Sequence, residues 1–106
     1  MNLRIAIACD HGGFELKVAL VRFLNNNGYE VVDLGTDSSD PVDYPDEAKE
    51  VVEEILSGKS EFGILVCGTG IGVSLAANKY KNIRAALCMN SYMARMAREH
   101  NNANVL

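Results

Sequence analysis

The sequence ILVCGTGIG, residues 64–72, joins an apolar run to a loop in which every second residue is glycine. The apolar run is typical of a buried β-strand, and a helical pattern follows the loop. Glycines allow the backbone to turn tightly and to approach a ligand closely. Cys67 stands where the strand is predicted to end. This stretch therefore predicts a strand, a turn and a helix in direct succession, with a nucleophilic side chain at the join.

Short apolar segments alternate with segments of helical periodicity along the whole chain. Strands are predicted at residues 3–9, 30–34, 62–67, 84–89 and 104–106. Helices are predicted at residues 14–26, 45–56, 70–79 and 91–99. Strands that alternate with helices through short connections form parallel sheets with right-handed crossovers. We therefore predict an α/β fold, a Rossmann-like three-layer sandwich with a parallel sheet of about five strands.

Length and composition indicate one domain. The chain has 106 residues, 48% of them hydrophobic, which is enough to form a core, and no linker or repeat interrupts residues 1–106. Residues 104–106 have the pattern of a strand that is only beginning, and natural termini rarely leave so short an edge strand. We therefore expect a single Rossmann-like domain that is truncated at its C-terminus.

Composition argues against several classes of partner. The net charge is −4 and no dense basic patch occurs, so no nucleic-acid partner is expected. No apolar run approaches the ~20 residues of a membrane span, so we predict a cytoplasmic protein without a membrane partner. The three cysteines lack the tight spacing of a disulfide framework or a zinc site, and we expect no metal.

Motif spacing argues against nucleotide cofactors and against phosphatase chemistry. The loop has the form G-x-G-x-G, whereas a dinucleotide fingerprint needs G-x-G-x-x-G, and the P-loop lysine is absent. We therefore expect no cofactor. A cysteine-dependent phosphatase needs an arginine six positions after its cysteine, but Val73 holds that position after Cys67.

Polar candidates follow the predicted strands. In open α/β sheets ligands bind beyond the carboxyl ends of the strands, and we assign both histidines, His11 and His100, to that edge. Asp10 and His11 follow the first strand, where a carboxylate suits hydroxyl protons and an imidazole suits an anion. The alternative is a turn aspartate beside a surface histidine. His100 is ambiguous, because a histidine near a helix C-terminus gains from the helix dipole whatever its function.

Cys67 is the candidate base or nucleophile. The helix after its loop presents free N–H groups and a positive dipole end, which suit an anion and favour the thiolate form of a nearby cysteine. The alternative is that Cys67 is a small buried apolar residue, as many strand cysteines are. Cys9 and Cys88 have no such loop directly behind them and are interpreted as packing residues.

The segments AIACDHGGFELK, DLGT, VDYPDEA, FGILVCGTGIGVSLAANK, IRAALC and MAREHNNANVL occur in this order. Together they resemble the type B ribose-5-phosphate isomerases and the related galactose-6-phosphate isomerase subunits. The resemblance covers essentially the whole chain. It implies a Rossmann-like homodimer or tetramer with active sites shared between subunits, which needs neither metal nor nucleotide. It also implies the interconversion of ribose 5-phosphate and ribulose 5-phosphate through an enediolate, in the pentose phosphate pathway.

The resemblance assigns roles to the glycine loop. Cys67 matches the family's base, which moves a proton between the two carbons of the enediolate. A second set of groups is implied to hold the oxygen on which negative charge develops. These groups are the Thr69 hydroxyl and the backbone N–H groups of Gly68, Gly70, Ile71 and Gly72.

Five residues outside the loop also match the family's site. Asp10 matches the carboxylate that contacts sugar hydroxyls, and His11 matches the histidine on the phosphate side. His100 matches the acid that opens the furanose ring, with Asn101 beside it on the substrate. Tyr44 is expected to line the pocket. The family's phosphate-binding arginines are expected beyond the end of the sequence, after the fifth strand.

Three alternatives to a ribose-5-phosphate isomerase stay open. One is an isomerase of a six-carbon sugar phosphate, allose 6-phosphate or galactose 6-phosphate. Another is a non-catalytic subunit that binds a phosphosugar without converting it. A phosphoacceptor signalling domain is disfavoured, because its aspartate should end the third strand, where Cys67 stands.

Overall fold

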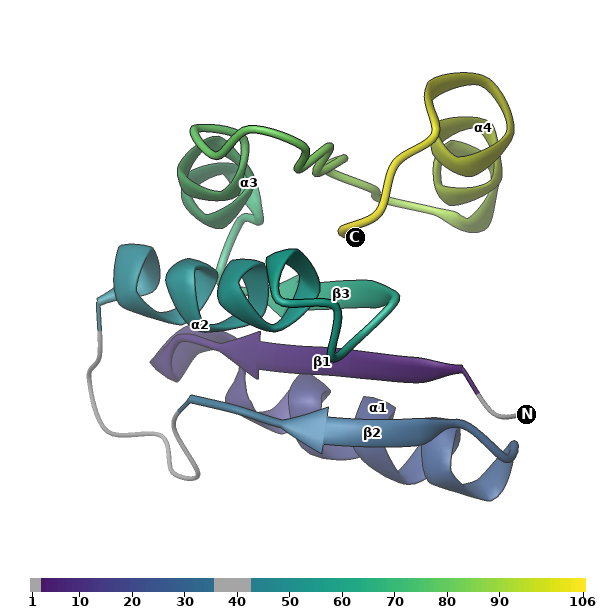
Figure 1. The fold of residues 1–106 in the computed structure, drawn as a ribbon. Helices are drawn as coiled ribbons and strands as arrows, with labels where there is room; N and C mark the ends of the chain where they lie inside the picture. Colours follow the sequence, from purple (N-terminus) through teal and green to yellow (C-terminus); the bar gives the residue numbers. More distant parts are fainter. Residues whose placement is uncertain (1–2, 36–42) are drawn as a thin grey trace.

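A computed structural model of the chain describes residues 3–35 and 43–106. In the described part, strands, helices and one 3-10 helix follow each other along the chain (Figure 1). In order they are β1 (Arg4–Cys9), η1 (His11–Gly13), α1 (Phe14–Asn26), β2 (Glu30–Asp33), α2 (Tyr44–Leu56), β3 (Phe62–Val66), α3 (Ile71–Ala77) and α4 (Ser91–Asn101). The alternation of strands and helices confirms the predicted α/β class.

The sheet is parallel and has the strand order β2-β1-β3. Two further segments extend it beyond β3, because Val105 forms parallel bridges with both Gly63 and Ala85. The Leu65 N–H donates to the carbonyl of Leu106 across 2.8 Å. The predicted strands at 84–89 and 104–106 are therefore in the right place but are reduced to single bridges. Within residues 3–35 and 43–106, five extended segments lie side by side, and three of them are strands.

Helices cover both faces of the sheet, as predicted. Figure 1 shows α1 on one face and the pair α2 and α3 on the other. The small side chains of Ala6 and Ala8 in β1 are completely buried, which allows α2 to pack closely with Val51 and Val52. On the other face an apolar groove separates α1 from α4.

Helix boundaries agree with the local sequence signals. In α2, Pro45 occupies the first turn, where its missing N–H is of no consequence, and Asp46 complements the helix dipole. α3 is shorter at both ends than the helix predicted at 70–79. It begins only after Gly70, because Gly70 has the left-handed φ of 78° and lies just outside the helix. In α4 the helix runs two residues beyond the predicted 91–99 and ends where Asn102 turns left-handed at φ 52°.

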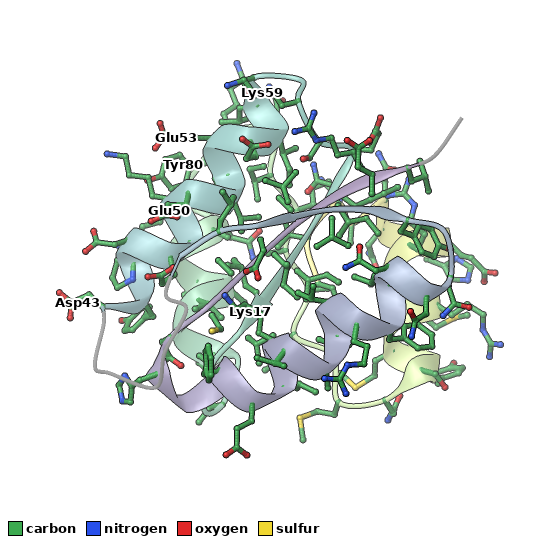
Figure 2. The ribbon with its side chains drawn as sticks, turned by 90° about the horizontal axis from the view of Figure 1, so that it is seen from below. Lys17, Asp43, Glu50, Glu53, Lys59 and Tyr80 are labelled. Carbon is green, nitrogen blue, oxygen red and sulfur yellow. The ribbon has the colours of Figure 1, made fainter. Side chains whose placement is uncertain are left out.

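An ion pair between a buried lysine and a half-exposed aspartate joins α1 to β2. Lys17 is 2% exposed, and its Nζ lies 2.7 Å from Oδ1 of Asp33. Figure 2 shows Lys17 pointing from α1 toward the sheet, whereas Glu50 and Glu53 point outward from α2. Burying an ammonium group is costly unless a carboxylate compensates it, so this pair holds α1 against the carboxyl end of β2.

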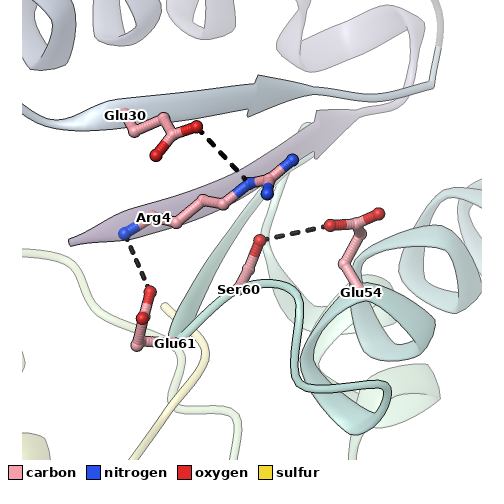
Figure 3. A network of polar contacts seen from close by, with 5 residues as sticks. All are labelled: Arg4, Glu30, Glu54, Ser60 and Glu61. Atoms are coloured by element: carbon pink, nitrogen blue, oxygen red, sulfur yellow. Dashed lines mark hydrogen bonds and ion pairs between the residues drawn. The ribbon is translucent and has the colours of Figure 1, made fainter. Parts of the chain in front are cut away.

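Polar contacts also join the amino ends of the strands. The backbone N–H of Arg4 donates to Oε2 of Glu61 across 2.8 Å, and Arg4 Nε lies 3.9 Å from Oε1 of Glu30 (Figure 3). Ser60 donates its hydroxyl to Glu54 at the end of α2 across 3.2 Å. These groups lie at the edge opposite to Cys67, and they bond to one another within the fold.

Candidate active site

The glycine loop holds Cys67 in a defined position. The backbone N–H of Gly70 donates to Sγ of Cys67 across 3.0 Å, and the N–H of Ile71 donates to the Thr69 hydroxyl across 3.1 Å. Cys67 is partly exposed. A hydrogen bond donated to sulfur stabilises the negative charge of a thiolate. The loop therefore holds the sulfur at the end of β3 with a backbone donor beside it.

The loop after β1 lies against the glycine loop. Oδ1 of Asp10 accepts hydrogen bonds from the N–H groups of Gly12 at 2.9 Å and Gly13 at 3.2 Å. The Asp10 N–H donates to the carbonyl of Val66 across 3.1 Å. A Cβ atom at Gly12 would lie 3.3 Å from the backbone nitrogen of Gly68. Asp10 is thus fixed beside Val66, the last residue of β3, which directly precedes Cys67.

Tyr44 and His11 lie at the same edge of the sheet. A Cβ atom at Gly72 would lie 3.0 Å from the ring of Tyr44, so the first residue of α2 packs over the start of α3. His11 is exposed in η1, directly after Asp10. The fold therefore gathers Asp10, His11 and Tyr44 around the loop that carries Cys67.

A cavity of ≈ 220 Å³ reaches Cys67. Residues of the glycine loop line it together with apolar side chains such as Leu16 and Leu87. The described residues that line this cavity do not include Asp10, His11 or Tyr44. The cavity is therefore the apolar side of the candidate site.

Sequence reasoning missed part of that lining. Cys88 was interpreted as a packing residue, yet it lines the cavity together with Met89, which is 77% exposed. A signal was available, because both residues end the fourth extended segment at the same edge as Cys67. Leu16 of α1 also lines the cavity, and its position depends on how α1 packs on the sheet.

The other two cysteines lie in surroundings that raise their pKa values. Cys9 is completely buried, and burial raises the pKa of its thiol, although the nearby Lys17 ammonium acts in the opposite direction. Burial also raises the pKa of Cys88. Both environments therefore favour the uncharged thiol at neutral pH.

The structure corrects the predicted position of His100 and Asn101. Because α4 runs back along the sheet, its last turn lies at the amino ends of the strands. The Arg98 guanidinium lies 5.1 Å from the ring centroid of Phe62, the first residue of β3, whereas Cys67 follows the last one. β3 separates the two ends by roughly 16 Å. Within one chain, His100 and Asn101 therefore lie far from Cys67, and assigning His100 to the carboxyl edge was wrong.

The described residues contain neither a grouped metal site nor a membrane helix. Across residues 3–35 and 43–106, no three histidine, cysteine, aspartate or glutamate side chains gather where an ion could bind them. Within the same ranges, no helix combines the length and apolar character that crossing a membrane requires.

Comparison with known proteins decides the family. The family model described as Ribose/Galactose Isomerase matches residues 5–106. The chain belongs to this family. Among curated proteins of the Ribose/Galactose Isomerase family, ribose-5-phosphate isomerase B of Escherichia coli K12 is 48% identical over 103 residues, which cover 97% of this chain and 69% of that protein.

Solved structures of the family share the fold. The ribose 5-phosphate isomerase of Thermotoga maritima superposes with a TM-score of 0.98 at 57% identity, covering 100% of this chain and 73% of that one. The ribose-5-phosphate isomerase B of Clostridium thermocellum gives 0.96 at 55% identity, covering 98% and 70%. The Rossmann-like arrangement predicted from the sequence is thus the arrangement of the family.

Proposed function

We propose that this member of the Ribose/Galactose Isomerase family is a sugar-phosphate isomerase that interconverts ribose 5-phosphate and ribulose 5-phosphate. The names of the relatives support the substrate class. The observation that carries the chemistry is the 3.0 Å hydrogen bond from the Gly70 N–H to Cys67 Sγ. This bond fixes the sulfur beside a loop of backbone N–H groups, and an enediolate mechanism requires both a base and donors that hold the developing oxyanion. The reaction belongs to the pentose phosphate pathway, and we place it in the cytoplasm.

Cys67 acts as the base in this proposal. Its thiolate removes the proton from C2 of the open-chain aldose, and the electrons of that C–H bond form the double bond of the enediolate. The carbonyl oxygen O1 becomes the oxyanion. The proton on O2 then passes to O1, and Cys67 returns its proton to C1, which gives the ketose. Atoms and charge are conserved, and the thiolate is regenerated.

Backbone donors stabilise the enediolate oxygen. The N–H groups of Gly70 and Ile71 already donate to Cys67 and Thr69, so they support the base and the shape of the loop. Gly72 lies in the first turn of α3, where N–H groups have no partner within the helix. In this proposal the N–H groups of Gly68 and Gly72 stabilise the negative charge that develops on the enediolate oxygen, and the Thr69 hydroxyl assists them.

The residues around the loop bind the rest of the substrate. Asp10 contacts sugar hydroxyls, and its position is fixed by the two N–H groups that donate to its Oδ1. His11, exposed next to it, faces the phosphate end. Tyr44, packed over Gly72, lines the site from α2.

His100 and Asn101 serve the site of a second copy in this proposal. They lie at the far end of α4 from Cys67, so one chain cannot use them at its own site. In a homodimer, alone or paired into a tetramer, His100 and Asn101 reach a site if the end of each α4 lies against the partner's glycine loop. Exposed apolar side chains near the cavity support such a contact, since Met89 is 77% and Tyr92 is 61% exposed.

The test is an assay of the purified protein on ribose 5-phosphate, with allose 6-phosphate and galactose 6-phosphate as competing substrates. We expect conversion of ribose 5-phosphate, and a drop of at least about a hundredfold in kcat for Cys67→Ala. Cys9→Ala is the matched control, because Cys9 is buried in the core and its variant removes a thiol without touching the loop. A Cys67→Ala protein as active as Cys9→Ala would contradict the assignment. Preference for a six-carbon substrate would change the substrate but keep the reaction.

A further inference from the structure

The last turn of α4, which carries His100 and Asn101, is held by a side chain from another segment. Nε of Arg84 donates to the backbone carbonyl of Asn101 across 2.6 Å. Arg84 belongs to the extended segment that bridges to Val105, seventeen positions earlier in the chain. The contact therefore links the end of α4 directly to the sheet.

Arg84 is itself fixed on its backbone. Its N–H donates to Oδ1 of Asn104 across 2.9 Å, and its carbonyl accepts from the N–H of Asn104 across 3.0 Å. The amide of Asn104 also donates to the carbonyl of Asn82 across 3.1 Å. Three hydrogen bonds thus hold the segment from which Arg84 extends. The guanidinium starts from an anchored backbone, so it can set the position of Asn101.

Arg98 closes the other side of the same turn. Its guanidinium donates to the carbonyl of Ala103 and to the side chain of Asn102, and it stacks on Phe62. Asn102 ends the helix in the left-handed region at φ 52°, where asparagine is better tolerated than most residues. Arg98 therefore stabilises the exit from α4, whereas Arg84 holds the carbonyl of the functional residue Asn101.

The chemistry of a polar pocket beside this turn argues against an anion site there. Arg84 and Arg98 line it, but so does the carboxylate of Glu61. Both terminal nitrogens of Arg98 already donate within the chain, as does Nε of Arg84. These guanidinium groups are engaged in ordering the turn, so ordering the turn is the function that the geometry supports.

We propose that Arg84 is a positioning residue for the isomerase reaction. Resting on the proposed function, this inference assigns to Arg84 the task of orienting His100 and Asn101 toward the partner's site. The guanidinium touches neither substrate nor reacting atoms, and it acts through the Asn101 carbonyl. Displacements of about 1 Å in positioned groups change rates by up to about a hundredfold, so a single such contact matters for turnover.

The primary variant is Arg84→Met, which keeps much of the side-chain length and removes the donors. We expect kcat on ribose 5-phosphate to fall about tenfold or more, with a smaller change in KM. Arg84→Lys retains a positive donor and should recover part of the loss. The control is Arg22→Met, the same change at an exposed position on α1, which should leave kcat within about twofold.

A double-mutant cycle separates positioning from general destabilisation. If Arg84 acts through the turn, Arg84→Met in a His100→Ala background should cost clearly less than in the wild-type background. If the two substitutions lower kcat independently, so that the factor lost in the double variant is the product of the two single factors, the proposal is overturned. It is also overturned if Arg84→Met is as active as Arg22→Met. If neither Arg84→Met nor Arg84→Lys folds, Arg84 is a stability determinant and the positioning role is overturned as well.

A spectroscopic measurement tests the positioning without activity. The chain has two histidines, so a His11→Gln variant assigns the imidazole NMR signals of His100. We expect the His100 signal to shift in Arg84→Met and to stay in place in Arg22→Met; an unchanged signal in Arg84→Met contradicts the inference. If the wild-type protein does not isomerise ribose 5-phosphate, the proposed function fails, and the NMR comparison still decides whether Arg84 orders His100.

Discussion

The backbone N–H of Gly70 donates to the sulfur of Cys67, three residues earlier, across 3.0 Å. Gly70 itself has the left-handed conformation, with a φ of 78°. The hydrogen bond ties the glycine loop to the side chain that acts as the base in the proposed reaction. Mutations that change the loop should therefore change both stability and isomerase activity.

A Cβ atom at Gly70 should disturb the fold more than one at Gly58. Both glycines have nearly the same φ, 78° and 80°, but a Cβ at Gly70 would lie 2.5 Å from Cδ1 of Leu87, while nothing lies within 4 Å at Gly58. We expect Gly58→Ala to cost about 1 kcal/mol of unfolding free energy from backbone strain alone, and Gly70→Ala to cost about 2 kcal/mol or more. Urea unfolding measures both values. Equal losses would show that Leu87 moves aside freely.

Gly13→Ala should be among the most destabilising glycine substitutions. The φ of Gly13 is −105°, so an alanine meets no conformational strain there. Its Cβ, however, would lie 2.5 Å from the carbonyl oxygen of Val66, a backbone atom in β3 that cannot rotate away. We expect a loss of about 3 kcal/mol in unfolding free energy. Gly12→Ala, whose Cβ would lie 3.3 Å from its nearest neighbours, should lose less; the reverse order would contradict this packing.

Cys9 should make stability fall at alkaline pH. Burial raises the pKa of its thiol above the ordinary value of 9.0, so the unfolded chain releases this proton at lower pH than the folded one. The stability contributed by the neutral thiol is present below pH 9 and is lost as the pH rises toward the folded pKa. Each such thiol contributes a slope of up to about 1.4 kcal/mol per pH unit.

The measurement is the unfolding free energy of the wild-type protein and of Cys9→Ala between pH 8 and pH 10.5. The variant loses buried volume at every pH, so the slopes are compared and not the absolute values. We expect a shallower decline for Cys9→Ala. Parallel curves would mean that Cys9 ionises equally in the folded and unfolded chain.

Local signals predicted the first half of the fold well. α1 begins at Phe14 after a glycine pair and ends at Asn26 before Gly28, and both limits were predicted from the sequence. Cys67 was singled out because a strand, a glycine turn and a helix follow each other within a few residues. Such features depend on neighbours along the chain, which a sequence contains directly.

Features that depend on tertiary packing were predicted less well. His100 was assigned to the carboxyl edge because it follows a strand and a helix, but a helix that follows a parallel strand returns to the amino edge. The apolar cavity lining from Leu16 and Leu87 depends on how α1 and the 84–89 segment approach the glycine loop. Cys9 ends β1 and Cys67 directly follows β3, and only the packed structure shows that Cys9 is completely buried while Cys67 is partly exposed.

The most direct test of the proposed shared site is complementation between two inactive variants. Cys67→Ala and His100→Ala are produced with different tags, co-expressed and assayed on ribose 5-phosphate after purification of the mixed dimer. A mixed dimer has one site with both residues intact and one with neither, so it should show about half of the wild-type activity per dimer. A mixed dimer as inactive as either parent would show that Cys67 and His100 do not act across subunits.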